Sequence, residues 1–139
     1  MRALLQRVSH ASVSVETREV AAIGAGLLVL LGIAREDTPA EAERLAAKVR
    51  ALRVFADAQG RMNEPLGPDR EILCVSQFTL YGDAAKGNRP SYGAAARPEL
   101  AEPLYERFCE LAGAKRGVFG AHMLVELVND GPVTLMLEA

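Results

Sequence analysis

The sequence contains few of the side chains on which most active sites and metal centres depend. Its 139 residues include no tryptophan, two cysteines (Cys74 and Cys109) and two histidines (His10 and His122). Two cysteines cannot build the disulfide framework of a small secreted module, and a structural zinc site needs four cysteine or histidine ligands. A serine or cysteine triad would have to recruit one of the same histidines. We therefore expect buried, reduced thiols, no metal ion and no cofactor, so any catalysis must use other groups.

The sequence also lacks a large excess of either charge and any long, uninterrupted hydrophobic run. Sixteen basic and eighteen acidic residues give a formal net charge of −2. This balance provides no general attraction to nucleic acid, although it does not exclude a local basic patch. The apolar segment 20–34 contains three glycines and is shorter than a membrane span of about 20 residues. We expect a cytoplasmic protein with no membrane or DNA partner.

Half of the residues are hydrophobic, and their periodicity predicts strands and two helices. Thr38 and Glu41 form a capping-box pattern that opens one helix, and apolar spacing predicts a second over residues 98–112, ending at Gly113. Strands are predicted over residues 2–8, 11–16, 20–23, 26–33, 71–78, 122–128 and 133–138. Antiparallel runs interrupted by two helices predict one α/β domain over residues 1–139, with one or two curved sheets and the helices on one face.

The first candidate site is the polar end of the predicted strand 71–78, which contains Ser76, Gln77, Phe78 and Thr79. Ser76 or Thr79 could act as a nucleophile, but no histidine or lysine adjoins either residue in the sequence to serve as its base. Gln77 or a backbone amide of this stretch could stabilise an oxyanion. The alternative is a polar strand terminus that caps its own backbone.

The second candidate is the segment 129–132, Asn-Asp-Gly-Pro, which stands between two apolar runs. Asp-Gly in this setting predicts an ordinary hairpin turn. Pro132, however, stands where the returning strand should begin, and proline is tolerated there only at sheet edges or strand starts. A cis bond before Pro132 would direct two consecutive carbonyls to the same side, as a rigid pair of acceptors. The sequence leaves the isomer open.

The third candidate is a loop rich in glycine and proline that carries Lys86, Arg89 and Tyr92. Two cations and a tyrosine on such a loop could contact a phosphate backbone and stack on a base. The alternative is a solvated surface loop without a ligand.

Taken together, these segments resemble the D-aminoacyl-tRNA deacylases of the bacterial and eukaryotic type, over essentially the whole chain. Two signature motifs are intact, SQFTL at residues 76–80 and NDGPVT at residues 129–134. Matching flanks stand at residues 5–8 (LQRV), 26–32 (GLLVLLG), 86–91 (KGNRPS), 102–108 (EPLYERF) and 119–121 (FGA). Either motif alone would be weak support, but both occur in order and with matching flanks.

The resemblance implies a homodimeric hydrolase with a layered α/β/β fold and mostly antiparallel, barrel-like sheets. Such an enzyme cleaves the ester between a D-amino acid and the 3′-terminal adenosine of tRNA. Ser76, Gln77, Phe78 and Thr79 would form the catalytic pocket. Gln77 and the backbone amide of Phe78 would lie near the scissile carbonyl, and Thr79 near the terminal adenosine or the carbonyl.

The resemblance also implies how the substrate's configuration is read. The Gly131-Pro132 bond is cis in this family and enters the active site of the other subunit. Its carbonyls would hold the α-amino group and leave no room for an L side chain, while Arg7 would brace the turn. Rejection by collision separates enantiomers that attractive contacts barely distinguish, and glycine still fits, so glycyl-tRNA is a second expected substrate. Contact with tRNA would be confined to its acceptor end, around Lys86 and Arg89.

Two mechanisms and two alternative functions remain open at this point. Either Thr79 is the nucleophile, or the 2′-OH of the terminal adenosine assists a water; the missing base beside Thr79 favours the second. The alternative functions are editing of an L-alanyl ester on the wrong tRNA and a non-catalytic tRNA-binding module of the same fold. Two departures from the family stand outside the motifs. His122 replaces a residue that is usually acidic, which we interpret as a neutral surface change, and the segment 112–119 is shortened.

Overall fold

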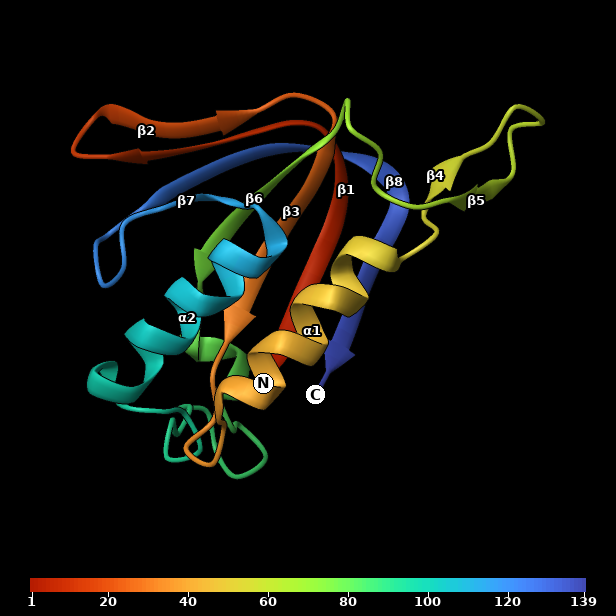
Figure 1. Ribbon diagram of the computed structural model, residues 1–139. Helices are drawn as coiled ribbons and strands as arrows, with labels where there is room; N and C mark the ends of the chain where they lie inside the picture. The colour runs from red at the N-terminus through yellow and green to blue at the C-terminus, as the bar shows by residue number, and fades with distance from the viewer.

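The computed structural model describes all 139 residues, and its main sheet is built around the two longest strands (Figure 1). These strands, β1 (Arg2–Val15) and β8 (Leu124–Glu138), pair in antiparallel fashion along most of their length. The shorter strands are β2 (Arg18–Ile23), β3 (Gly26–Gly32), β4 (Phe55–Ala56), β5 (Met62–Glu64), β6 (Glu71–Ser76) and β7 (Lys115–Arg116). The second half of β1 pairs with β2 and its first half with β3, and β6 and β7 then extend the sheet in parallel. The strands β4 and β5 form a separate hairpin.

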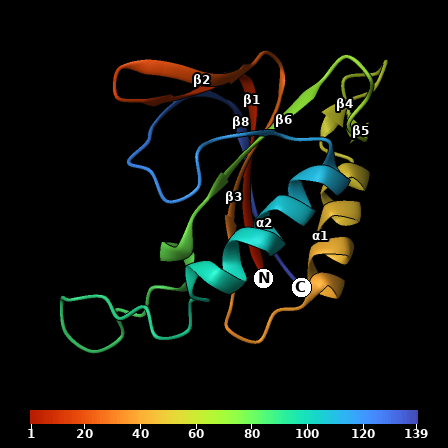
Figure 2. The ribbon, with the colours of Figure 1, turned by 60° about the vertical axis from the view of Figure 1, so that its left-hand side comes forward.

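The helices α1 (Pro39–Ala51) and α2 (Pro98–Ala112) cover one face of this sheet, as two views show (Figures 1 and 2). A cluster of 23 buried residues lies between them and the strands. Leu28 and Leu73 alternate with the residues of that cluster and belong to a second cluster of seven, on the opposite face. Because both faces are buried, β3 is apolar throughout. The predicted α/β domain with two helices and a curved, barrel-like sheet is confirmed.

The start of α1 and the end of α2 lie where local chemistry predicts. Thr38 caps α1, and its backbone N–H donates to the Glu41 carboxylate at 2.7 Å. The Thr38 hydroxyl also donates to this carboxylate, and this bond, followed by the backbone N–H, lowers the pKa of Glu41 from 4.5 to about 2. At the end of α2, Gly113 adopts the left-handed conformation, with φ of 67°, that terminates helices at low cost for glycine. No helix in the structure is long and apolar enough to cross a membrane.

The predicted hairpin at residues 129–132 is wrong. β8 continues through this segment, and both of its halves pair with β1 in the same direction, Asn129 opposite Val8 and Thr134 opposite Gln6. Residues 130–133 therefore stand opposite Arg7 alone, as a large bulge in a continuous strand. The local Asp-Gly turn signal fails because the long strand β1 offers both flanking runs a partner on the same side.

Two other predicted boundaries change for related reasons. The predicted strands 2–8 and 11–16 form the single strand β1, since His10 between them still pairs with β8. The predicted strand 71–78 ends at Ser76, and the next residues turn into a short 3₁₀ helix, η1 (Phe78–Tyr81).

Candidate active site

The end of β6 presents a polar turn beside the parallel strand β3. Ser76 stands opposite Leu31, and the backbone N–H of Gln77 donates to the Leu31 carbonyl at 2.8 Å. Gly32 permits the close approach of η1, because a Cβ there would lie 3.0 Å from Leu80 Cβ and 3.1 Å from the Gln77 carbonyl oxygen. As the first residue of η1, Phe78 has no partner for its N–H within that turn. The strand end therefore offers both side chains and a free backbone donor.

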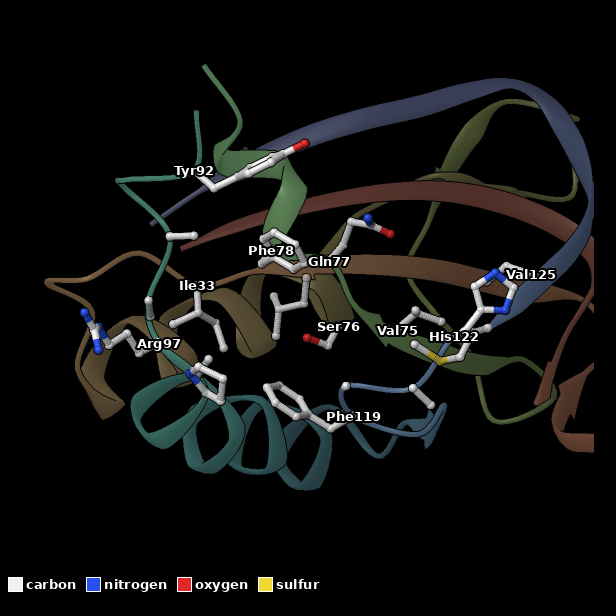
Figure 3. Close-up of a pocket in the computed structure, with 18 residues that line it drawn as sticks. Ile33, Val75, Ser76, Gln77, Phe78, Tyr92, Arg97, Phe119, His122 and Val125 are labelled. Carbon is white, nitrogen blue, oxygen red and sulfur yellow. The ribbon is translucent and has the colours of Figure 1, made fainter. Parts of the chain in front are cut away.

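A pocket of about 610 Å³ opens at this strand end, between β6, the first turn of α2 and the segment before β8 (Figure 3). Twelve of its 18 lining residues are hydrophobic. The lining residues are Leu31, Ile33, Val75, Ser76, Gln77, Phe78, Tyr92, Ala95, Ala96, Arg97, Pro98, Ala101, Phe119, Gly120, Ala121, His122, Met123 and Val125. An apolar pocket with a few polar groups at one wall suits a flat organic ligand whose reactive group lies at the polar wall.

Aromatic side chains fix the shape of this pocket. The Phe78 ring meets the Tyr92 ring edge to face, with centroids 5.2 Å apart, and both are largely exposed. Phe119 is anchored from behind by Tyr105, at 5.8 Å between centroids. Tyr105 is buried and donates its hydroxyl hydrogen bond to the Cys74 carbonyl at 2.9 Å. The Phe119 wall is thus tied to the core.

Thr79 lies beside the pocket rather than on its wall. Its hydroxyl oxygen accepts a hydrogen bond from the Gln77 side-chain amide, and this is the only hydrogen bond of the Thr79 side chain. An amide N–H is a donor, so it cannot take a proton from the threonine hydroxyl. The three preceding motif residues, Ser76, Gln77 and Phe78, all line the pocket.

Neither thiol lines the pocket, so neither contributes a nucleophile to this site. Cys74 on β6 and Cys109 on α2 are both buried, as predicted. Burial raises the pKa of the Cys74 thiol well above its ordinary value, which opposes formation of a thiolate. No group of three or more histidine, cysteine, aspartate or glutamate side chains is arranged to hold a metal ion.

Gly131 and Pro132, joined by a cis peptide bond, lie on the exposed bulge of β8 and do not line the pocket of their own chain. Arg7 holds this bulge from β1. Its Nε donates to the Asp130 carbonyl at 3.0 Å and lies 3.2 Å from the Asp130 carboxylate, while Nη1 donates to the Val54 carbonyl. The Asn129 side-chain amide closes the other side, donating to the carbonyls of Arg7 and Val133. Within one chain, the two signature motifs therefore lie apart.

Lys86 and Arg89 lie on an exposed loop, and neither side chain forms an ion pair or an intramolecular hydrogen bond. Two backbone hydrogen bonds between Asp83 and Ser91 close the base of this loop. Neither cation lines the pocket, whereas Tyr92, from the same predicted segment, does.

The sequence pattern did not reveal three lining residues, Arg97, Phe119 and His122. Arg97 precedes the first residue of α2, and the other two lie on a turn that follows β7. β7 is only two residues long, too short for a periodicity signal, yet it pairs with β6 and brings this turn to the pocket. His122 is thus an exposed residue that also lines the pocket. Its interpretation as a surface position agrees with the structure, and the neutrality of the change stays a prediction.

A model of the protein family described as D-Tyr-tRNA(Tyr) deacylase matches residues 4–138. The chain belongs to this family. It is 54% identical to a D-aminoacyl-tRNA deacylase of Opitutus terrae, covering 100% of this chain and 97% of the relative. It is 56% identical to a D-aminoacyl-tRNA deacylase of an Exiguobacterium species, covering 99% and 98%.

Two solved structures share the fold of this chain. A structure described as a c-Myc DNA unwinding element binding protein is 44% identical to this chain and superposes with a TM-score of 0.94, covering 100% of this chain and 99% of that one. A probable eukaryotic D-amino acid tRNA deacylase shares the fold at 18% identity, with a TM-score of 0.82 and coverage of 99% and 98%.

Proposed function

We propose that this chain removes D-amino acids, and also glycine, from the 3′-terminal adenosine of mischarged tRNA by hydrolysis of the ester. Family membership makes it a D-aminoacyl-tRNA deacylase, a hydrolase of aminoacyl-tRNA esters. The observation that carries the proposal is the pocket at the end of β6, with Ser76, Gln77 and Phe78 on its polar wall. The test is the rate of ester loss from matched D- and L-aminoacyl-tRNA.

The polar wall suits the stabilisation of a developing oxyanion. Hydrolysis of an ester passes through a tetrahedral species whose oxygen gains negative charge, and preorganised N–H donors stabilise that charge. The N–H of Phe78 and the side-chain amide of Gln77 are the donors on this wall. We assign the scissile carbonyl to this position, with the adenine base in the apolar part of the pocket.

We propose that the substrate's own 2′-OH assists the attacking water, rather than Thr79 acting as nucleophile. A nucleophilic hydroxyl needs an adjacent base or a lowered pKa. The Thr79 hydroxyl has only the Gln77 amide as a partner, and no lysine, histidine or carboxylate contacts it. The 2′-OH of the terminal ribose lies next to the 3′ ester, so it can assist the water without a base from the protein.

We propose that the Gly131-Pro132 turn acts in the pocket of a second copy, in a homodimer. The turn is exposed and does not line its own pocket, so a role in chiral selection requires another chain. β8 also exposes large apolar side chains, among them Leu124 and Val128, and pairs with only one strand. Exposed apolar groups on such an edge favour association with a second sheet.

The proposed turn would read configuration through its carbonyl groups. Carbonyls fixed by the backbone do not depend on a rotamer, so they can hold the α-amino group while the side chain of the amino acid varies. Lys86 and Arg89 stand free of intramolecular partners, which supports a contact with acceptor-end phosphates. We expect this activity in the cytoplasm, where aminoacyl-tRNA is used.

A further inference from the structure

We propose that His122 binds the phosphate that links the terminal adenosine to the preceding nucleotide. The inference rests on the proposed function, since it assumes that the pocket receives the 3′ end of tRNA. It adds to that function a phosphate contact that depends on the histidine at position 122.

His122 is held at the pocket by an ordered turn. The turn contains a hydrogen bond from the Ala121 N–H to the Val118 carbonyl and a left-handed Gly120, with φ of 76°. Phe119, three residues before His122, packs on the buried Tyr105. The imidazole itself makes no hydrogen bond and no ion pair within the chain, so its nitrogens are free for a ligand.

The charge of the pocket wall favours an anion. Its titratable residues are Tyr92, Arg97 and His122, and none of the lining residues is a carboxylate. Among charged residues close by in the chain, Arg116 pairs with Glu106. Glu126 follows the lining residue Val125 on β8 and therefore points to the opposite face. Glu19, on β2, is separated from Leu124, on β8, by the strand β1, where Ser14 pairs with both residues.

The geometry of the substrate selects His122 over Arg97. On the terminal ribose the ester is at C3′ and the phosphate is attached through C5′ to the neighbouring C4′, whereas the base is at C1′, so the phosphate lies nearer to the reacting end than the base does. In Figure 3, His122 lies toward the end of the pocket to which the Gln77 side chain points, and Arg97 lies at the opposite end. The ribose-borne phosphate therefore meets His122, and the base occupies the apolar part between Phe78 and Phe119.

The contact is a hydrogen bond from an imidazole N–H to a phosphate oxygen, which is charge-assisted because the acceptor is ionised. The suitable probe is the methyl diester of adenosine 5′-monophosphate, because a diester carries one negative charge, as the phosphate in tRNA does. Adenosine is its uncharged counterpart. His10, the other histidine, lies exposed on β1 and does not line the pocket, so His10→Gln is the matched control.

The experiment measures binding of both probes by titration and by NMR of the two imidazole side chains. At pH 6 we expect the diester to bind roughly five- to tenfold more tightly than adenosine, with a perturbation of the His122 resonances alone. The preference should disappear in His122→Asn and persist in His10→Gln.

Three results would overturn the proposal: no preference for the diester in the unaltered protein, no response of the His122 imidazole at millimolar diester, or a preference that survives His122→Asn. In the last case, its loss in Arg97→Met would assign the phosphate to the other end of the pocket. Deacylation of D-aminoacyl-tRNA is measured in parallel. If the D-ester is hydrolysed but the preference for the diester does not depend on His122, only this inference fails. If the D-ester is not hydrolysed, the proposed function fails.

Discussion

Arg7 and Asp130 join the two strands at the point where β8 bulges. The Arg7 Nε lies 3.0 Å from the Asp130 carbonyl oxygen and 3.2 Å from its carboxylate. This contact fixes the position of the two residues that follow, Gly131 and Pro132. The effect of replacing Arg7 therefore measures how far deacylation depends on the position of that bulge.

Replacing Arg7 with methionine should reduce deacylation of D-aminoacyl-tRNA by roughly tenfold to a hundredfold, because small displacements of positioning groups cost rates of this size. Thermal unfolding should still be cooperative. Arg107→Met is the control, since Arg107 forms an exposed ion pair with Glu43 on the helices, and such pairs contribute little. An unchanged rate in Arg7→Met would show that deacylation does not depend on the position of the bulge.

Replacing Thr79 with alanine distinguishes the two mechanisms. We expect the single-turnover rate to fall by less than about tenfold, whereas loss of a covalent nucleophile costs on the order of 10⁴-fold or more. A tRNA ending in 2′-deoxyadenosine, charged at the 3′ position, should instead resist hydrolysis by the unaltered protein. Near-complete loss of hydrolysis in Thr79→Ala, with tRNA binding retained, would identify Thr79 as the nucleophile.

Gly26 should tolerate no side chain. It stands opposite Glu71, and a Cβ at this position would lie 1.8 Å from the Glu71 carbonyl oxygen. Gly26→Ala should lower the free energy of unfolding by about 3 kcal/mol or more. Gly24→Ala is the matched control, because a Cβ there has no atom within 4 Å, and its effect should stay within about 1 kcal/mol. Urea unfolding measures both, and similar values would contradict the close approach of β3 and β6.

The capping box of α1 should make stability depend on pH in acid. The pKa of Glu41 is lowered to about 2 in the folded protein, from 4.5. Its carboxylate therefore stabilises the fold above about pH 4.5, and this contribution is lost as the pH falls toward 2. Glu41→Gln should lower the unfolding temperature at pH 7, with the difference from the unaltered protein closing near pH 2.

Glu43→Gln provides the control for this pH dependence on the same helix. The Glu43 carboxylate makes only an exposed contact with Arg107 and caps no backbone group. We expect its effect at pH 7 to be smaller than that of Glu41→Gln. A difference for Glu41→Gln that stays constant from pH 7 to pH 2 would contradict the capping role of Glu41.

Local chemistry made part of this fold predictable. Thr38, Glu41 and Gly113 mark helix ends through contacts within one turn, so the sequence contains the full signal. The continuous apolar sequence of β3 likewise predicted that both faces of this strand are buried. The same local logic gave a hairpin at Asp130-Gly131, and it failed because pairing with the distant β1 decides the path of β8. The family resemblance, by contrast, was confirmed.

The site was predictable only where its residues are contiguous. Ser76, Gln77 and Phe78 follow one strand, and the structure brings all three to the pocket. His122 and Arg97 reach the same pocket through a two-residue strand and a helix start, and neither leaves a periodic pattern. These pocket residues are therefore positioned by long-range contacts, which the periodicity of the sequence does not predict.

The most direct test of the whole account is the loss of ester from matched D- and L-aminoacyl-tRNA, carrying the same amino acid on the same tRNA, in the presence of the purified protein. We predict that the D-ester is hydrolysed at least roughly a hundredfold faster than the L-ester, because collision with the turn excludes the L side chain. Equal rates for the two, or a D-ester as stable as in buffer alone, would contradict the account.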